Sequence, residues 1–353
     1  MTLFDSPDFE GHEGVHAFFD EKTGLKSIIA IHSTARGPAA GGCRMWDYSS
    51  ADAAVTDALR LSRGMSYKNA MADLDFGGGK AVIIGDSRSQ KTPELFEAFG
   101  RAVDSLAGKY WTAEDVGVSV ADLTATRRAT RFVAGLEGHA AASGDPSPVT
   151  AEGVFRGVRL CVERALNRDL NGVHVAIQGV GHVGGYLAEK LHAAGARLTI
   201  ADVNQAALDA IAAKTGAEIV PVEAIFDVDA DVFAPCALGG AISAATLPRL
   251  KVKVIAGAAN NQLANAAIGQ AVFERGILYA PDYVINGGGI INVAAEIRAL
   301  EAGGAFDAAW VSTKLDRLAQ TLGEVIAQSI AEKRPADLVA DEIARDRIAA
   351  ARA

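Results

Sequence analysis

The sequence predicts an α/β protein with two domains, and three observations support this prediction. The chain of 353 residues is long for a single hydrophobic core. In its second half, a strand, a glycine-rich turn and a helix follow one another over residues 173–192. Between the halves, residues 137–150 are rich in Gly, Ala, Ser and Pro, as in an interdomain linker. Hydrophobic residues make up 50% of the chain and charged residues 22%, which is typical of a globular protein.

The first domain, residues 1–140, is expected to open with a β-hairpin. β-Branched and aromatic runs at residues 15–19 and 26–32 flank a turn at 21–24. Two amphipathic helices are then expected. One begins at Ser50 or Asp52 and carries Met65 and Lys68 on or near one face, and the other runs from Pro93 to about Leu106.

Two glycine-rich segments of this domain are predicted to be loops that contact a ligand. In Phe76-Gly77-Gly78-Gly79-Lys80, three consecutive glycines cost conformational entropy unless positive φ angles or close backbone contacts require them. Lys80 would hold its ammonium beside bare backbone, although a tight turn with a solvated lysine is the alternative. The spacing is not that of a P-loop, because Leu74 and Ala81 stand where that motif needs Gly and Ser or Thr. The second segment is Gly37–Arg44.

A short strand that begins at Tyr110 is expected to run into a loop with two acids, Glu114 and Asp115. The alternation of side chains along a strand turns Glu114 away from Asp115. The end of a strand is a common position for a catalytic carboxylate. Asp115 is therefore the candidate catalytic acid of this segment.

The second domain, residues 148–300, contains a dinucleotide-binding motif in its expected context. A strand leads into Gly179-Val180-Gly181-His182-Val183-Gly184, a helix follows, and the next strand ends at Asp202, 18 residues past the last glycine. Gly179 permits the tight turn, Gly181 lets a pyrophosphate approach the backbone, and Gly184 lets the helix pack on the strand. The helix N-terminus offers N–H donors and a partial positive charge to phosphates.

The residues around this motif predict NAD rather than NADP as the cofactor. Asp202 would bind the ribose hydroxyls and repel a 2′-phosphate, and no arginine follows it in Val203-Asn204-Gln205. Further short strands near residues 219, 232, 254 and 278 complete the sheet, and most run into loops where such sheets bind ligands. In these loops, Cys236 is expected to pack beside the cofactor, and Asn260 and Asn261 are ligand contacts or turn formers.

The composition argues against several other classes of function. A net charge of −9 disfavours nucleic acid as a partner. The three cysteines are far apart, and no cluster of His, Cys, Asp or Glu has metal-ligand spacing, so no metal is expected. Acids at the start of the chain, the lack of an apolar run of 18 residues and the odd number of cysteines predict a cytoplasmic protein without membrane attachment.

With these motifs, the chain resembles the Glu/Leu/Phe/Val family of amino-acid dehydrogenases, and most closely its leucine-dehydrogenase branch. The resemblance covers nearly the whole chain. It implies an N-terminal substrate-binding and oligomerisation domain, a Rossmann NAD-binding domain, and an active-site cleft between them. Helices at 305–353 would pack back on the first domain or on another subunit, in a dimer or an octamer. The motifs are Gly41-Gly42-x-Arg44, Met65-x-x-Lys68, Gly77-Gly78-Gly79-Lys80, Asp115-Val116-Gly117, the glycines of 179–184, and Ala258-Ala259-Asn260-Asn261-Gln262.

The resemblance implies the NAD-dependent, reversible oxidative deamination of an apolar L-amino acid to the 2-oxo acid and ammonia. Lys68 and the backbone at Gly42 would bind the substrate carboxylate, and Lys80 would be the general base on the attacking water. Asp115 would bind the amino group and shuttle protons, and Asn261 would orient the substrate. The other implied substrate contacts are Gly41, Met65, Ala40, Ala113, Ile290 and Val293, and the implied cofactor contacts are Gly179, Val180, Gly181, His182, Val183, Gly184, Asp202, Val203, Cys236, Ala237, Ala258 and Asn260.

The chemistry of these residue types agrees with the implied roles. A lysine near a second cation, Lys68, in a glycine-walled and partly dry cleft has its ammonium form disfavoured, which makes it a usable base. Glutamate-specific relatives carry a lysine where this chain has Ala40, so glutamate is not expected. Branched-chain relatives carry a leucine there. We therefore predict leucine and other branched aliphatic substrates, with phenylalanine or tryptophan as the alternative because Ala40 enlarges the pocket.

Two other readings explain the motifs less well. A non-catalytic NAD-binding sensor would be expected to lack Lys80 or Asp115, and both are present. A hydroxy-acid dehydrogenase usually employs a histidine acid–base, but none of the seven histidines lies in a comparable glycine-walled segment. His182, within the phosphate-binding turn, is most simply a solvent-facing spacer.

Overall fold

The computed structural model describes residues 3–352 and divides the chain into two compact units. Unit 1 contains the chain up to Asp145, together with Ile290–Val311 and the end of the chain from Ala344. Unit 2 contains Pro146–Gly289 and Ser312–Ile343. The division after Asp145 falls inside the segment expected to be a linker. Within the tail from residue 305, the residues up to Val311 and from Ala344 onward belong to unit 1, and Ser312–Ile343 belongs to unit 2.

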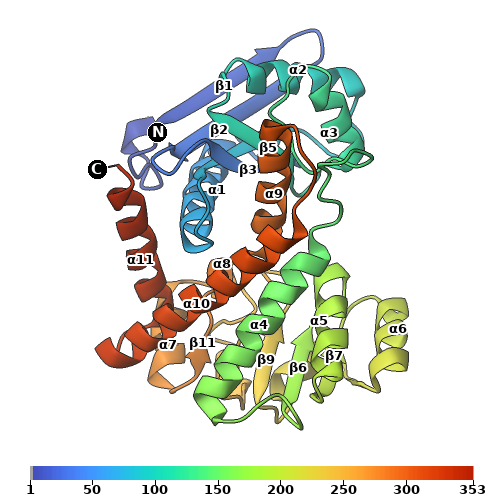
Figure 1. Ribbon diagram of the computed structural model, residues 1–353, viewed down its shortest axis with the longest axis vertical. Helices are drawn as coiled ribbons and strands as arrows, with labels where there is room; N and C mark the ends of the chain where they lie inside the picture. The colour runs from blue at the N-terminus through green and yellow to red at the C-terminus, as the bar shows by residue number, and fades with distance from the viewer. Residues whose placement is uncertain (1–2, 353) are drawn as a thin grey trace. The chain divides into compact units, whose positions relative to one another are not determined.

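Unit 1 is built on a five-stranded mixed sheet with the order β1-β2-β4-β3-β5 (Figure 1). The first two strands form the expected antiparallel hairpin, and β2 also pairs antiparallel with β4. The strands β3, β4 and β5 run parallel to one another, with β3 in the middle. The bounds are Gly14–Asp20 (β1), Leu25–Ser33 (β2), Ala39–Trp46 (β3), Gly77–Ile84 (β4) and Tyr110–Glu114 (β5).

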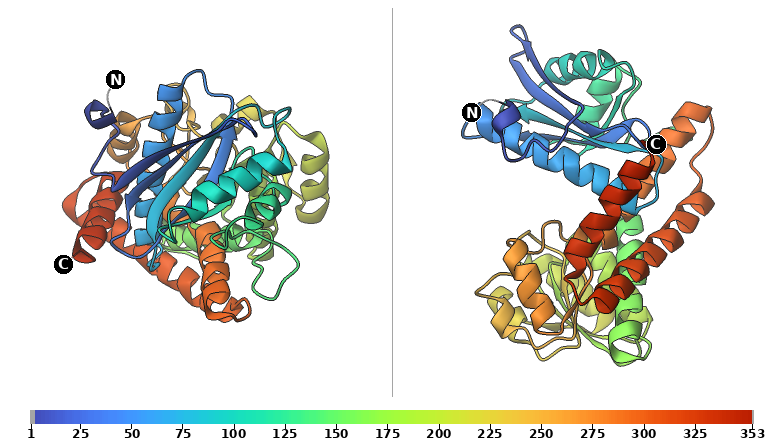
Figure 2. Two further views of the ribbon diagram at one scale, coloured as in Figure 1. Left: turned by 90° about the horizontal axis from the view of Figure 1, so that it is seen from above. Right: turned by 90° about the vertical axis from the view of Figure 1, so that its left-hand side faces the viewer.

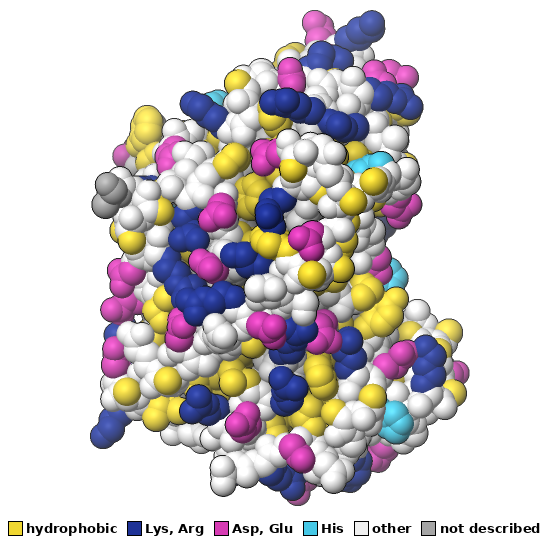
Figure 3. Space-filling view, in the orientation of Figure 1, with side chains coloured by type: hydrophobic (Ala, Val, Ile, Leu, Met, Phe, Trp, Pro, Cys, Tyr) yellow, Lys and Arg dark blue, Asp and Glu magenta, His cyan; other side chains and the backbone are white. Residues whose placement is uncertain are grey.

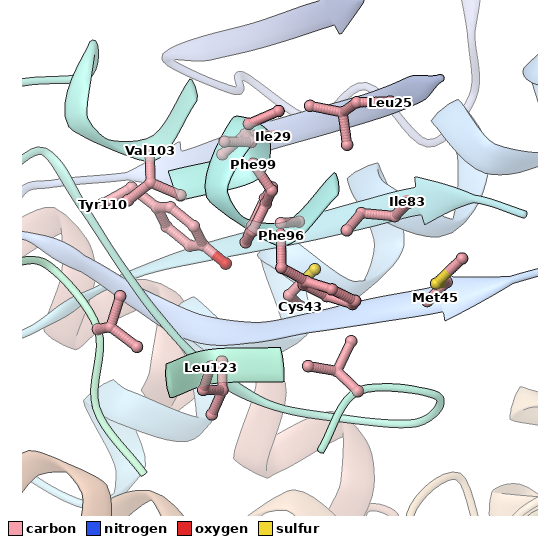
Figure 4. Close-up of a cluster of buried hydrophobic side chains, with 14 of the residues drawn as sticks. Leu25, Ile29, Cys43, Met45, Ile83, Phe96, Phe99, Val103, Tyr110 and Leu123 are labelled. Atoms are coloured by element: carbon pink, nitrogen blue, oxygen red, sulfur yellow. The ribbon is translucent and has the colours of Figure 1, made fainter. Parts of the chain in front are cut away.

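Helices cover both faces of this sheet (Figure 2). One face packs against α2 (Pro93–Asp104) and α3 (Val120–Arg127) through a core that includes Phe96, Phe99 and Leu123 (Figure 4). The other face packs against α1 (Ala51–Met71), which begins after its N-cap Ser50. Thr92 caps α2, and Pro93 is its first residue, as expected for the first turn of a helix.

The prediction that the two glycine-rich segments are loops is wrong. Gly77, Gly78 and Gly79 begin the strand β4, and most of the segment Gly37–Arg44 belongs to β3. None of the three consecutive glycines is among the residues with positive φ. They meet the second condition for glycine, close backbone approach, because a Cβ at each position would overlap a neighbouring atom.

Unit 2 contains a six-stranded, fully parallel sheet with the order β11-β10-β9-β6-β7-β8 (Figure 1). This is the order expected for a Rossmann-type sheet. Its strands are His174–Gln178 (β6), Arg197–Ala201 (β7), Glu218–Ile219 (β8), Val232–Pro235 (β9), Val254–Ile255 (β10) and Leu278–Tyr279 (β11). Its helices are Ser147–Leu166 (α4), His182–Ala193 (α5), Gln205–Thr215 (α6), Ala266–Glu274 (α7) and Asp282–Ile285 (α8).

Three helices complete the described chain: Gly288–Ala302 (α9), Ala308–Glu332 (α10) and Ala336–Ala350 (α11). Within unit 2, α10 packs along α4, where Leu322 lies close to Gly157. Short 3₁₀ helices lie at Leu3–Asp5, Val222–Asp227 and Leu247–Arg249. Among residues 3–352, no helix is both long and apolar enough to cross a membrane. Acidic, basic and apolar side chains all lie on the face drawn in Figure 3.

Candidate active site

The register of the parallel strands in unit 1 brings the predicted substrate residues to one face of the sheet. Ala40 pairs with Gly78 on one side, and Gly42 pairs with Ala113 on the other. Since side chains alternate along a strand, Ala40, Ala113 and Lys80 point to the same face. This is the face that α1 covers, because its alanines pack against Val82, two residues after Lys80.

Lys80 and Asp115 form an ion pair on this face. The Lys80 side chain is buried, with the residue 5% exposed, and its Nζ lies 2.9 Å from Asp115 Oδ2. Burial raises the pKa of Asp115, but the charges of Lys80 and Arg44 outweigh burial and leave this pKa below its ordinary value. The structure thus pairs the two predicted catalytic residues and keeps the carboxylate ionised.

Arg44 joins Asp115 to a second carboxylate. Its Nε donates to Asp115 Oδ2 at 3.0 Å, and its Nη1 donates to Asp57 Oδ2 at 2.9 Å. The Tyr48 hydroxyl donates to the same Asp57 oxygen at 2.5 Å. Sequence reasoning quoted Arg44 in a motif without giving it a role. Its position two residues after Gly42, on the same face of β3, is the signal that would have placed it in the site.

Glu114 lies outside this cluster. Its register partner is Cys43, whose side chain packs in the core on the α2 face of the sheet. The Glu114 side chain is exposed, and its pKa is raised by partial burial and by the acids Asp145 and Glu137. Strand alternation therefore separates the two acids, as the sequence predicted.

The glycines of β4 let α1 lie directly on the sheet. A Cβ on Gly78 would overlap the backbone nitrogen of Ser66 in α1. Met65, the residue before Ser66, contacts Gly41 of β3, where a Cβ would lie 3.0 Å from its Cγ. Lys68 follows one turn after Met65 in α1 and is half-buried. The close packing of helix and strand therefore fixes where Met65 and Lys68 stand relative to β3 and β4.

Two buried residues that sequence reasoning did not select hold the strands of the site. The Tyr110 hydroxyl donates to the carbonyl of Gly41 at 2.8 Å and lies 3.2 Å from that of Gly42. The Asn69 amide donates to the carbonyls of Gly77 at 2.6 Å and Ala40 at 3.3 Å. Both side chains are fully buried. Their role depends on the register of three strands, which no local sequence pattern reveals.

The helix α9 adds the remaining predicted substrate residues of unit 1. Ile290 and Val293 are half-buried and lie one turn apart, so they share a face of this helix. Further along α9, the fully buried Glu296 accepts hydrogen bonds from the backbone of Leu136 and from the backbone and hydroxyl of Ser143. These bonds attach the segment after β5 to α9 and so position the helix in unit 1.

In unit 2, the glycine-rich turn has the conformation that its sequence predicts. Gly179 adopts a φ of +93°, which favours glycine. A Cβ on Gly184 would overlap the carbonyl oxygen of Gly179, so this glycine lets α5 start tightly against the turn. A Cβ on Gly181 would meet nothing within 4 Å. Packing within the protein therefore does not require glycine at 181, whereas a ligand pressed against the backbone would.

Asp202 ties the end of β7 to this turn. Its Oδ2 accepts a hydrogen bond from the Val180 amide at 2.7 Å, and its Oδ1 accepts one from Asn204 at 2.8 Å. The following residue, Val203, is 91% exposed, and His182 in the turn is also exposed. The carboxylate is thus fixed beside the start of α5, next to an exposed apolar side chain.

Two further loops of unit 2 follow the carboxyl ends of the strands β9 and β10. Ala237 packs against Gly179, and burial raises the pKa of the neighbouring Cys236 thiol to about 12. Such a thiol is a poor nucleophile. Asn261 adopts a φ of +51°, as a turn former can, and Asn260 accepts a hydrogen bond from the Asn286 amide at 2.8 Å. The same amide donates to the carbonyl of Ala258 at 3.1 Å, so Asn286 anchors this loop.

The chain thus combines a parallel sheet that carries this glycine turn with a second unit that holds a lysine–aspartate pair, and this combination is expected of a two-domain dehydrogenase. The description "Glu/Leu/Phe/Val dehydrogenase, dimerisation domain" matches residues 13–132, and "Glutamate/Leucine/Phenylalanine/Valine dehydrogenase" matches residues 145–210 and 198–353. The chain belongs to this family and is an amino-acid dehydrogenase, an oxidoreductase.

Individual relatives agree over nearly the whole chain. The leucine dehydrogenase of Thermoactinomyces intermedius is 45% identical over 349 residues, which are 99% of this chain and 94% of the relative. The phenylalanine dehydrogenase of Bacillus thermotolerans is 47% identical over 303 residues, covering 84% of this chain and 79% of that protein. The crystal structure of L-tryptophan dehydrogenase from Nostoc punctiforme is similar with a TM-score of 0.85 and 38% identity, over 97% of both chains.

Proposed function

We propose that the protein catalyses the NAD-dependent, reversible oxidative deamination of an apolar L-amino acid, with leucine and other branched-chain amino acids preferred. The products are the 2-oxo acid, ammonia and NADH. The observation that carries this proposal is the Lys80–Asp115 ion pair, which lies on the same face of the sheet as the apolar residues Ala40 and Ala113. A charged pair beside apolar side chains suits a substrate with a polar α-carbon and an apolar side chain.

NAD fits the glycine turn of unit 2. The positive φ of Gly179, the open space at Gly181 and the uncapped start of α5 together offer backbone N–H groups to a pyrophosphate. Asp202 would bind the ribose hydroxyls, and its charge would oppose a 2′-phosphate. When bound, NAD would supply the hydride acceptor for the α-carbon of the amino acid. The other proposed contacts are Val180, His182, Val183, Gly184, Val203, Cys236, Ala237, Ala258 and Asn260.

The chain's own residues would bind the amino acid and move its protons. Lys68 and the Gly42 backbone would bind the carboxylate, with Gly41 and Met65 alongside. Asp115 would hold the amino group and carry its proton away. Lys80 would take a proton from the water that attacks the imino carbon, and would stabilise the oxygen as the C–N bond breaks and ammonia leaves. Asn261 would orient the substrate.

The size of the side-chain pocket decides among the apolar substrates. We infer that Ala40, Ala113, Ile290 and Val293 line it. Ala40 lies within β3 and is 1% exposed, so the strand fixes its position, and a residue of this size would limit the substrate side chain less than a leucine there. Leucine dehydrogenases, a phenylalanine dehydrogenase and a tryptophan dehydrogenase are all similar to this chain. A preference for phenylalanine or tryptophan is therefore the second candidate, and it has the small residue at position 40 in its favour.

We also propose that the protein is a cytoplasmic homo-oligomer. Among the described strands, β1 forms an edge of the unit 1 sheet and pairs with β2, and Phe19 on this strand is 68% exposed. An exposed edge with an apolar side chain is suited to a second copy of the chain. Light scattering would distinguish a dimer from an octamer. The three cysteines are free thiols, which suits a reducing compartment.

One assay tests the proposed reaction. The purified protein is incubated at alkaline pH with NAD and each of Leu, Ile, Val, Phe, Trp and Glu, and NADH is followed by its absorbance. The expected result is the highest kcat/KM for Leu, Ile or Val, with little reaction of Glu or with NADP. If kcat/KM is highest for Phe or Trp, the protein prefers an aromatic substrate, and the small side chain of Ala40 would explain how the pocket accommodates it. No reaction with any amino acid, while NADH still binds, would contradict the proposal and support a non-catalytic sensor.

A further inference from the structure

The carboxylate of Asp115 is shared by two cations in unit 1. Lys80 Nζ and Arg44 Nε lie 2.9 and 3.0 Å from the same oxygen, Oδ2. On its other side, Arg44 pairs with Asp57 at 2.9 Å. All four side chains are buried or half-buried, so their charges interact more strongly than surface charges do. The proposed mechanism uses Lys80 and Asp115, and it gives no role to Arg44 or Asp57.

We propose that Arg44 is a positioning residue of the dehydrogenase reaction, which holds Asp115 in place and shares the charge of its carboxylate with Lys80. This inference rests on the proposed function, because it assumes that Lys80 acts as a base. Arg44 can bridge two carboxylates because its guanidinium carries several donors in a rigid plane. Tyr48 holds the far carboxylate, Asp57, with a hydrogen bond of 2.5 Å.

The charge count of the cluster gives this proposal a direction. Lys80 and Arg44 are positive and Asp57 and Asp115 negative, so the cluster is neutral. When Lys80 gives up its proton to act as a base, the cluster becomes singly negative. Without Arg44 the same step would leave two negative charges on the remaining groups of the cluster. Proton release would then cost more, and a higher pH would be needed for turnover.

Asp57 has the opposite effect in this scheme. Neutralising Asp57 would leave one extra positive charge, so Lys80 would release its proton at a lower pH. A purely structural cluster predicts something else, namely that both changes impair the enzyme in the same way. The other titratable groups that interact with the cluster are Tyr48, Cys43, Tyr110 and Glu114, and Lys68 lies on α1, the helix that packs against this face of the sheet; none of these groups changes in either variant.

The test is the pH profile of kcat/KM for oxidative deamination in the full-length enzyme. In this profile, kcat/KM rises with pH as Lys80 loses its proton, and this rise is the acidic limb. Arg44→Met should move the acidic limb to higher pH by about one unit, so that kcat/KM falls about tenfold at a pH where it is still rising. Asp57→Asn, which keeps an oxygen for Arg44, should move the limb to lower pH. Arg44→Lys should keep the limb near its original pH but lower kcat, since one ammonium does not hold two carboxylates. Arg88→Met, an exposed arginine of unit 1, is the matched control and should leave the profile unchanged.

The outcomes separate this inference from the proposed function. If the unmodified protein deaminates no amino acid, the proposed function fails. If it is active but the limbs of Arg44→Met and Asp57→Asn move together, or neither moves, the inference about Arg44 is wrong. Thermal unfolding and NADH binding show whether each variant is folded. Should Arg44→Met not fold, Asp57→Asn decides alone: movement to lower pH supports the inference, and any other result overturns it.

Discussion

Gly78 of β4 lies against the backbone of Ser66 in α1 so closely that a single Cβ would overlap its nitrogen. This contact lies two residues before Lys80 on the strand and two residues before Lys68 on the helix. The spacing between the two lysines of the proposed site is therefore set by a glycine. Neither residue of the contact takes part in the proposed chemistry.

Gly78→Ala is therefore expected to force α1 away from β4. Overpacking of this kind costs about 1–3 kcal/mol of the free energy of unfolding, and contact with backbone places this case at the upper end. Gly64→Ala is the matched control, because Gly64 lies in the same helix with nothing within 4 Å of an added Cβ. It should stabilise the protein by up to about 1 kcal/mol, since alanine favours a helix. Urea unfolding measures both, and equal effects would contradict the packing argument.

Lys80→Met tests the proposed base. Methionine roughly keeps the volume of this buried side chain but accepts no proton. General base catalysis contributes about 10²–10⁴-fold, so kcat should fall by at least that range. NADH binding, followed by fluorescence, should be nearly unchanged because the glycine turn lies in the other unit. The exposed Lys109→Met is the control, with activity expected to stay close to that of the unmodified protein. Parallel loss of turnover and NADH binding would mean that Lys80 has a structural role.

The sequence predicted most elements of the fold because their signals are local. The hairpin, the helix starts after Ser50 and at Pro93, and the strand–turn–helix around Gly179 each depend on neighbouring residues only. The sequence pattern predicts a loop for the glycines of β4, because glycine commonly occurs in turns. Glycine is needed there because Ser66 of α1 packs against Gly78 and Tyr110 of β5 packs against Gly79.

The same limit applies to the candidate site. Lys80 and Asp115 were selected from motifs, and the structure pairs them. The contacts of Arg44, Asn69 and Tyr110 follow from the register of β3 with β4 and β5, which has no signature in any one of these strands. Sequence reasoning therefore finds residues that stand in a distinctive motif, and misses those that hold the motifs together.

Asp202→Asn tests the choice of cofactor. Asparagine keeps an oxygen for the Val180 amide, which now donates to Asp202 at 2.7 Å, but it removes the negative charge. The ratio of kcat/KM for NAD to that for NADP should fall by at least about tenfold, because a like charge opposite the 2′-phosphate costs several kcal/mol. Asp202→Ala should in addition weaken NAD itself, since the turn loses its acceptor. An unchanged ratio in both variants would contradict the assignment of Asp202 to the ribose.

The buried histidine His32 predicts how stability depends on pH. It is 7% exposed, its Nδ1 lies 2.8 Å from the Ser66 hydroxyl, and its ring meets that of His12 at 4.9 Å. Burial and, to a smaller extent, the charges of His12 and Arg352 lower the pKa of His32 to about 4. The folded protein therefore holds this ring neutral at a pH where the unfolded chain, with a pKa near 6.5, binds a proton.

This difference stabilises the fold fully above about pH 6.5, and the stability is lost as pH falls from about 6.5 towards 4. The slope from His32 is at most about 1.4 kcal/mol per pH unit, or about 3 kcal/mol over the whole range. His32→Asn should lower stability at pH 7.5 but flatten the slope between pH 6.5 and 4, as urea unfolding at several pH values would show. The exposed His182→Asn should leave the slope unchanged. An equally steep slope without His32 would mean that other groups, such as His12, cause the acid sensitivity.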